Sequence, residues 1–396
     1  MKKPKSHALV SRLTLAALSL PGMMQETQAG RIEETYNGDF QYGHYSENNQ
    51  RMSVDIFEGV ISTPIGRSMT ASVNLVRDVI SGASPRFNQS VKGQVKQILS
   101  GASIVEQRDA ISSNLTYFFD TVAVGLGGGF SRENDYTSRY ANTNVSLDLN
   151  KKLTTLNFGA SVAFDEVEPT PTSSGSIRND DCGTKCNKTS QQYLLGVSQV
   201  LDKDSVLQSN ITFGYHQGYL SDPYKLVYSN EDGLLFDTRP REKFQWAWLT
   251  QYVRHFKELN SAALHADYRF YTDDWGINAH TVELSWHQPI MAGWQVIPRF
   301  RYYSQDRADF YQAVFDNVSQ VSSYSSDYRL AGFGTISGGI KFSKEITQIK
   351  TLNQLKFQTG FEYFDRKANY QLGGTGSGNF DDFSYFLVTA SFNLKF

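Results

Sequence analysis

Hydrophobic and polar residues alternate along most of the chain, in segments of about 11 to 16 residues. In the last segment every second residue from Phe386 to Phe396 is apolar, while most residues between them, such as Asn393 and Lys395, are polar. Because successive side chains of a strand point to opposite sides of a sheet, this pattern predicts long β-strands with one apolar face. Strands of soluble proteins usually have about 5 to 6 residues, whereas a tilted membrane strand needs about 9 to 11. The strand length therefore favours a membrane sheet.

The alternation predicts sixteen strands, and their spacing separates the connections into two groups. Connections after even-numbered strands are short, and those after odd-numbered strands are often long. The strands are expected at 31–44, 51–62, 67–80, 107–119, 121–133, 136–149, 153–167, 188–201, 205–220, 243–256, 261–274, 279–290, 293–307, 326–344, 350–369 and 384–396. The long connections are expected at 81–106, 168–187, 221–242, 308–325 and 370–383.

Short turns at one rim and long loops at the other are typical of a bacterial outer-membrane barrel with both termini in the periplasm. In hydrocarbon every backbone N–H and C=O must be paired within the protein, so a sheet crosses a membrane only when it closes without edges. The predicted fold is an all-β, transmembrane, antiparallel up-and-down barrel of about sixteen strands, with short periplasmic turns and long extracellular loops.

The first residues predict export. Three lysines within the first five residues precede a short apolar stretch, Leu13 to Leu20, and Thr27-Gln28-Ala29 is a passable cleavage site. We expect a signal peptide over 1–29 and the barrel over 30–396, in the outer membrane of a Gram-negative bacterium. An ordinary N-terminal helix is the alternative. No run of about 18 apolar residues occurs, which excludes a helical membrane bundle.

Charge and motif content narrow the function classes. The 38 Lys and Arg residues against 40 Asp and Glu residues leave no basic field, so no nucleic-acid partner is expected. No phosphate-binding loop, dinucleotide fingerprint or zinc-protease motif occurs, and we expect neither a cofactor nor a metal site.

Charged residues cluster on the predicted lumen face, near mid-height of three neighbouring strands: Asp267, Arg269, Glu283, Arg299 and Arg301. Opposed charges across a wet lumen create a field that filters solutes by charge. This pattern predicts a channel or transporter for a small charged or polar solute, narrowed by the 81–106 or 221–242 loop. A salt-bridge ladder that only stiffens the wall is the alternative.

Two other function classes stay open. A plugged barrel could support a surface assembly or a periplasmic redox complex. Glu283, Ser285 and His287 share one face and resemble a hydrolase triad, as in a barrel-borne lipid hydrolase. However, residues two apart on a strand lie about 7 Å apart, too far for a Ser–His hydrogen bond. We therefore expect no enzyme and no catalytic residues.

Cys182 and Cys186 lie in a predicted extracellular loop. In an exported protein such a pair most often forms a disulfide; a metal or redox site and free thiols are the alternatives. The acidic pairs Asp273-Asp274 and Asp381-Asp382 could bind divalent cations or bridge lipopolysaccharide, although solvated loop tips are the simpler expectation.

Several segments resemble one known family of proteins. They are 77–85, 221–224, 268–281, 299–305 and 308–311. From about Arg31 to Phe396 the chain resembles an uncharacterised family of Gram-negative outer-membrane β-barrel proteins, known as a domain of unknown function. The resemblance implies a barrel among outer-membrane lipids and lipopolysaccharide, and it carries no catalytic residues over. Phe396 resembles the C-terminal aromatic residue that the barrel-assembly machinery recognises.

Overall fold

The computed structural model describes residues 35–49, 51–91, 94–100, 104–169, 182–347, 352–374 and 382–396. The predicted signal peptide, 1–29, lies outside the described residues. Among the described residues, no helix has the length and apolar character needed to cross a membrane.

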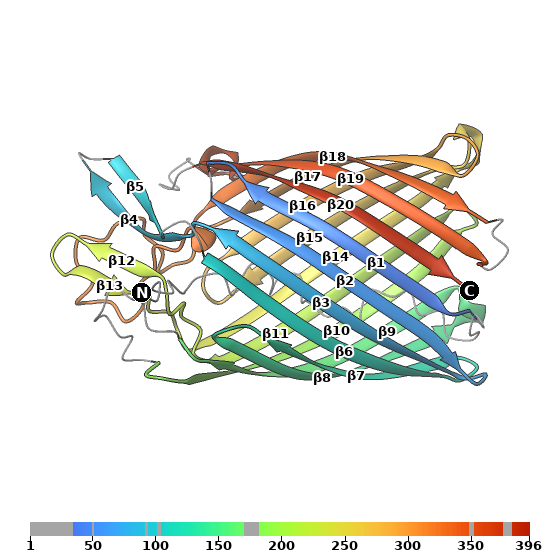
Figure 1. Ribbon diagram of the computed structural model, residues 1–396, viewed down its shortest axis with the longest axis horizontal. Helices are drawn as coiled ribbons and strands as arrows, with labels where there is room; N and C mark the ends of the chain where they lie inside the picture. Colours follow the sequence, from blue (N-terminus) through green and yellow to red (C-terminus); the bar gives the residue numbers. More distant parts are fainter. Residues whose placement is uncertain are drawn as a thin grey trace, which may run out of the picture.

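Sixteen strands form one closed antiparallel barrel (Figure 1). Each strand pairs with its neighbours along the chain, and β1 pairs with β20, so that Phe40 lies opposite Phe392 at the closing seam. The predicted fold class is confirmed. The barrel strands are β1 (Asn37–Glu47), β2 (Met52–Ile65), β3 (Met69–Gly82), β6 (Ile104–Phe118), β7 (Val122–Arg132), β8 (Tyr136–Leu149), β9 (Thr154–Val167), β10 (Cys186–Asp202), β11 (Ser205–Gly218), β14 (Glu242–Phe256), β15 (Ala262–Asp273), β16 (Asn278–Pro289), β17 (Trp294–Gln305), β18 (Phe333–Ile346), β19 (Gln354–Lys367) and β20 (Phe383–Lys395).

The two ends of the barrel differ in their connections. At the turn end, strands are joined by short segments such as 66–68, 119–121 and 203–204. At the loop end, two long connections carry hairpins of their own, which lie beyond the barrel wall on the left of Figure 1. These hairpins are β4 (Pro85–Val91) with β5 (Gln94–Leu99), and β12 (Leu226–Ser229) with β13 (Gly233–Phe236). The predicted asymmetry of the connections is therefore present.

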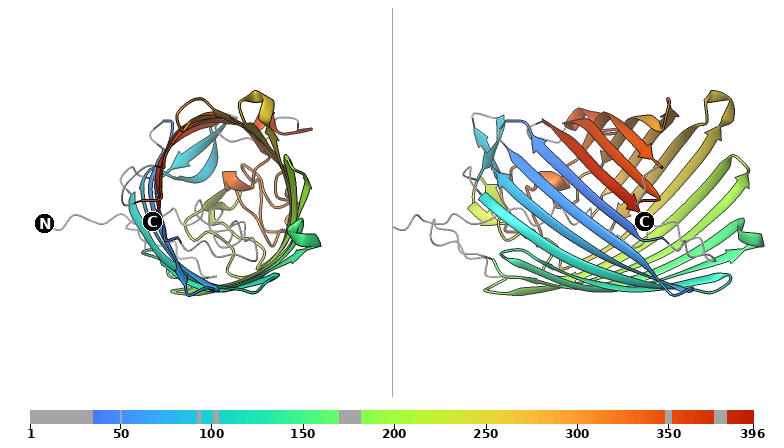
Figure 2. Two further views of the ribbon diagram at one scale, coloured as in Figure 1. Left: turned by 90° about the vertical axis from the view of Figure 1, so that its right-hand side faces the viewer. Right: turned by 45° about the vertical axis from the view of Figure 1, so that its right-hand side comes forward.

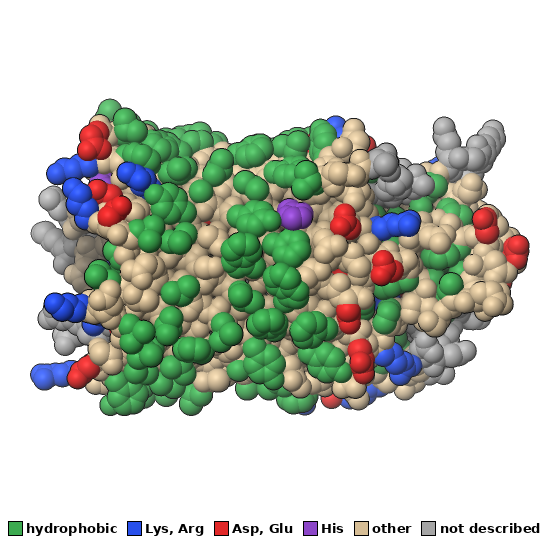
Figure 3. Space-filling model, turned by 180° about the vertical axis from the view of Figure 1, so that it is seen from behind, with side chains coloured by type: hydrophobic (Ala, Val, Ile, Leu, Met, Phe, Trp, Pro, Cys, Tyr) green, Lys and Arg blue, Asp and Glu red, His purple; other side chains and the backbone are tan. Residues whose placement is uncertain are grey.

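The outer wall carries the apolar face that the alternation predicts. The rest of the protein leaves large apolar side chains there uncovered: Ile61 is 67% exposed, Leu126 62% and Phe164 57%. Figure 3 shows hydrophobic side chains over the middle of one face, with most charged side chains toward the two ends. A soluble monomer rarely exposes an apolar surface of this extent, whereas lipid solvates it at no cost.

One predicted strand begins too early. The pattern predicted a strand over 326–344, but β18 starts at Phe333. The preceding residues instead form a buried 3₁₀ turn, η3 (Tyr328–Leu330), whose Asp327 carboxylate accepts a hydrogen bond from the backbone of Arg329. Figure 2 shows this short orange helix inside the barrel outline. The residues before Phe333 thus turn into the mouth.

Three segments pack together at the loop end, and we call them the cap. They are residues 219–241, residues 306–332 and the β4–β5 hairpin. An apolar cluster joins the first two segments to the β15–β16 turn. Its members are Leu220, Trp275, Ile277, Ala308, Tyr311, Leu330 and Ala331.

Candidate functional site

Arg299 joins two carboxylates on the lumen wall. Its Nε donates to Glu283 Oε1 at 2.8 Å, and its Nη1 donates to Glu362 Oε2 at 2.7 Å. Glu362 also accepts a hydrogen bond from Ser337 Oγ at 2.9 Å. These side chains come from four neighbouring strands, β16 to β19, because the register sets Ser285 opposite Arg299 and Glu362 opposite Gly339. The charge of Arg299 is therefore neutralised within the wall.

Arg269 and Arg301 lie on the same face of the barrel wall as Arg299, but their partners differ. Among the described residues neither arginine forms an ion pair. The Arg269 guanidinium lies 5.7 Å from the centre of the Tyr271 ring, and Arg301 Nε is buried without a hydrogen-bond partner. Asp267 accepts a hydrogen bond from Gln251 Nε2 at 3.2 Å. The five residues selected from the sequence thus lie on three adjacent strands. Glu283 and Arg299 form an ion pair, Asp267 is bound by a neutral amide, and the two other arginines have no ion pair among the described residues.

The lumen also contains a hollow, which lies away from β15, β16 and β17. A cavity of about 390 Å³ lies along the opposite part of the wall, and polar residues form most of its lining. They are Asp39, Gln41, Glu58, Ser72, Asn74, Ser112, Ser113, Asn114, Tyr140, Asn142, Lys356, Gln358, Ser391 and Asn393. A lining of this composition favours water, and it has no counterpart in a packed core.

The distance argument against a Ser–His contact was wrong. Ser285 Oγ lies 3.3 Å from His287 Nε2, because the imidazole leans along the strand toward the hydroxyl. The His287 ring also stacks on His265, with the ring centres 4.2 Å apart. Glu283, the third residue of the suggested triad, is bound by Arg299 instead. These residues consequently form a polar wall and lack the aligned carboxylate that a triad needs.

A buried ion network crosses the cap. The Asp327 carboxylate accepts hydrogen bonds from Arg239 Nη2 at 2.8 Å and from Arg329 Nε at 2.8 Å. Arg239 also donates to Asp237 at 2.7 Å, and Arg329 donates to Asp222 at 2.7 Å. Burial alone would raise the pKa of Asp327, but the arginines and Lys225 around it hold that pKa well below its ordinary value. The cap is therefore fixed by charges that water does not screen.

The cap is also attached to the barrel and to its own hairpin. Arg366 Nη2, on β19, donates to the backbone oxygen of Tyr328 at 2.7 Å. Lys225 Nζ donates to the backbone oxygen of Pro85 and so joins the 219–241 segment to β4. Burial lowers the pKa of Lys225 to about 8.

We expect the cap to resist proteolysis better at pH 9 than at pH 7. A lysine whose pKa falls on folding destabilises the folded state below that pKa, and the cost is relieved as the pH rises toward about 10.4, its ordinary value. Limited proteolysis of the detergent-solubilised protein at the two pH values measures the difference. Lys225→Met keeps the apolar stem and should show no such pH dependence. A variant that retained the full pH dependence would contradict the assignment to Lys225.

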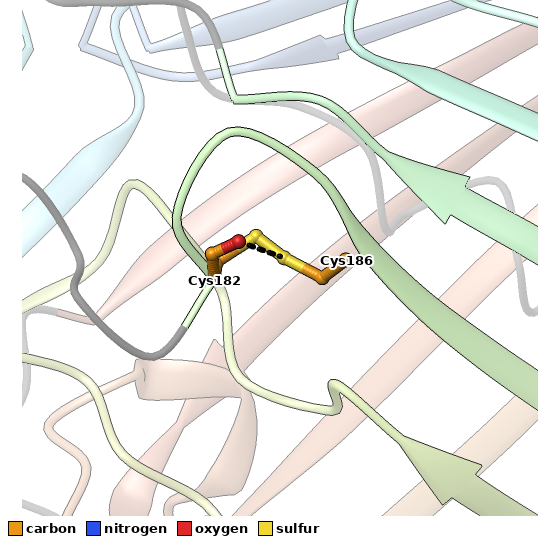
Figure 4. Close-up of a disulfide and its surroundings, with 2 residues drawn as sticks. All are labelled: Cys182 and Cys186. Atoms are coloured by element: carbon orange, nitrogen blue, oxygen red, sulfur yellow. Dashed lines mark hydrogen bonds between the residues drawn. A yellow bond between two sulfur atoms is a disulfide. The ribbon is translucent and has the colours of Figure 1, made fainter.

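A disulfide joins Cys182 and Cys186 at the loop end (Figure 4). Both cysteines are buried against Val167 and Tyr219. The bond closes the turn that leads into β10.

The two residues of the first acidic pair differ, since Asp274 is exposed and Asp273 is not. Asp273 is buried, lies 2.9 Å from Lys243 Nζ, and accepts hydrogen bonds from the backbone of Trp275 and Ile277. The expectation of an exposed carboxylate was wrong there, because the carboxylate shapes the β15–β16 turn. Asp381 of the second pair lies outside the described residues.

A model of a protein family matches residues 10–387, nearly the whole chain. The chain belongs to the family described as "Protein of unknown function (DUF3570)". The resemblance to an uncharacterised barrel family is thereby confirmed. No curated protein matches the chain.

Solved structures share the fold of this family member at low sequence identity. CdiB from Acinetobacter baumannii is similar with a TM-score of 0.52 and 9% identity, over 92% of this chain and 60% of CdiB. OccD3 from Pseudomonas aeruginosa gives a TM-score of 0.44 and 10% identity, over 92% of each chain. A bacterial polysaccharide outer-membrane secretin gives 0.48 and 6%, over 92% of this chain and 99% of the secretin. The chain thus spans less than two thirds of CdiB, and that similarity shows the barrel fold alone.

Sequence reasoning missed the partners that decide which charges are available. Glu362 lies on the polar face of its strand by alternation, so it could have been selected as a lumen residue. Nothing in the pattern showed that Glu362 would bind Arg299, which lies 63 residues earlier in the chain. Arg239 lies in a long connection, which has no periodicity, and Asp327 lies in a segment that the pattern assigned to a strand, so the sequence did not predict that they would meet.

Proposed function

We propose that this protein is an outer-membrane channel that passes small polar solutes and prefers anions. The observation that carries the proposal is that Arg269 and Arg301, on the polar face of β15 and β17, form no ion pair among the described residues. The lumen also holds a polar cavity, which is lined by residues of other strands. A fixed positive charge beside a water-filled path raises the local concentration of anions. Arg299 contributes little to this field, because Glu283 and Glu362 neutralise it.

The experiment is a conductance measurement on the purified protein in a planar bilayer. We expect stepwise currents and, in a gradient of KCl, a reversal potential of the sign that chloride preference produces. A reversal potential of the opposite sign would contradict the selectivity. The absence of any current at all would contradict the channel.

A plugged barrel that supports an assembly is the second candidate. The buried ion network of the cap favours it, since such a network resists opening. Single-channel recording distinguishes the two functions, because a permanently closed barrel gives no conductance.

The location and partners follow the same proposal. The loop end would face the outside and the turn end the periplasm, in keeping with short periplasmic turns. Outer-membrane lipid and lipopolysaccharide would contact the apolar wall. Phe396, which is 49% exposed at the turn end, would remain available to the barrel-assembly machinery.

A further inference from the structure

Three acidic side chains meet at the loop end, away from the lumen charges. Glu106 lies near the start of β6, and Glu133 and Asp135 belong to the turn between β7 and β8. Carboxylate oxygens of all three lie within 4.8 Å of one another. Each side chain is buried, with 4%, 7% and 4% of its surface exposed. Three carboxylates are thus crowded into a space that water hardly reaches.

On the turn side of this cluster, each of the two residues has one carboxylate oxygen without a hydrogen bond. Glu133 Oε2 and Asp135 Oδ1 are buried and make no hydrogen bond. Among the described residues neither Glu133 nor Asp135 forms an ion pair. A buried ionised carboxylate without a partner is very costly, so a native structure normally supplies a proton or a cation.

The nearby arginine does not supply that charge. Arg108 donates through Nε to Asp78 Oδ2 at 2.6 Å, and Asp78 is only 1% exposed. Arg108, whose charge lowers the pKa of Glu133 without cancelling the effect of burial, is therefore paired with a fourth carboxylate, Asp78. Burial is the main cause that raises the pKa of Glu133 to about 7, and the negative charge of Asp135 adds to it. The protein alone therefore stabilises the ionised form of Glu133 poorly.

The donor set selects the kind of cation. Oxygen ligands suit Ca²⁺, Mg²⁺ and Mn²⁺ and disfavour softer metals. Calcium bonds of about 2.3 to 2.6 Å place opposite oxygens about 4.6 to 5.2 Å apart, so oxygens within 4.8 Å can contact one ion. Mg²⁺ usually keeps several waters and takes only one or two carboxylates. Three converging carboxylates therefore fit Ca²⁺ better.

We propose that Glu106, Glu133 and Asp135 form a calcium-binding site at the rim of the barrel. The site also reaches the cap, because the Tyr224 hydroxyl donates a hydrogen bond to Asp135 Oδ2. An occupied site thus joins β6, the β7–β8 turn and the 219–241 segment of the cap. It is independent of what passes through the lumen.

The test is calcium binding by the full-length protein in detergent, stripped with EDTA and examined by equilibrium dialysis with Ca²⁺ alone. We expect one saturable site per chain, with a dissociation constant of about 10⁻⁴ to 10⁻³ M, as in extracellular calcium modules. Glu133→Gln should weaken binding at least about tenfold, within the range found for lost metal-site contacts. Glu168→Gln, an exposed acid near the same turn, should leave it unchanged.

No saturable binding to the wild type would overturn the proposal, and so would a folded Glu133→Gln variant that binds as the wild type does. The wild-type measurement decides whether a site exists even where a variant fails to fold. Glu106→Gln provides a second substitution on a different strand. Folding of each variant is checked by the mobility of the unheated protein on a gel, since a folded barrel and an unfolded chain migrate differently.

Discussion

Asp327→Ala should open the cap and raise the single-channel conductance several-fold, with larger current fluctuations. The substitution removes the carboxylate that accepts hydrogen bonds from both Arg239 and Arg329, and it leaves two buried guanidinium groups with one carboxylate each. Breaking a buried ion pair from one side costs about 3–5 kcal/mol. Recording in planar bilayers measures the result.

Asp316→Ala is the matched control, because Asp316 is an exposed carboxylate in the same cap segment. Its removal should leave the conductance unchanged. The low pKa of Asp327 also fixes the sign of a pH effect. Its stabilising contribution is present at neutral pH and is lost only as the pH falls through the folded-state pKa, well below its ordinary value. If Asp327→Ala conducted as the wild type does, the cap would not limit passage.

The second large effect is expected from reversing the two available lumen charges. The double variant Arg269→Glu, Arg301→Glu should change the sign of the reversal potential in a KCl gradient, from anion preference to cation preference. The double variant removes two positive charges and adds two negative ones, so the net charge of the lumen wall falls by four. Arg299→Gln should change selectivity less and stability more, because it would leave Glu283 and Glu362 facing each other unpaired.

A second double variant, at the turn end of the barrel, makes the same change in net charge and serves as the control. Arg67 and Lys203 are exposed in the short turns 66–68 and 203–204, so converting both to Glu alters the net charge equally but outside the lumen. This double variant should keep the native sign of the reversal potential. If the variant Arg269→Glu, Arg301→Glu also kept the native sign of the reversal potential, the two arginines would not determine the selectivity.

The barrel could be predicted from the sequence because its strands follow one simple rule. Alternation sets the face of every side chain, and the length of each segment sets the span, so residues such as Glu283 and Arg301 could be assigned to the polar face of their strands. Pairing between distant strands has no such rule. Glu362 and Arg299 meet because two strand registers, β17 with β18 and β18 with β19, set both opposite Gly339, which has no side chain to separate them.

The cap and the acidic cluster were beyond the reach of periodicity. Residues 326–332 have a pattern compatible with a strand, yet burial of Tyr328 and the capping hydrogen bond from Arg329 to Asp327 turn them into the mouth. Likewise, Glu133 and Asp135 read as an ordinary polar turn. Only the position of β6 beside β7 brings Glu106 to them. Tertiary contacts, and not local preference, decide such regions.

The seam between β1 and β20 has a consequence for biogenesis. The outer edge of β1 stays unpaired until β20, a strand of thirteen residues at the other end of the chain, has been made, so the barrel cannot close while the chain is still being synthesised. Such an edge attracts other strands and invites aggregation. A chain shortened by this one strand would keep open edges at β1 and β19 permanently.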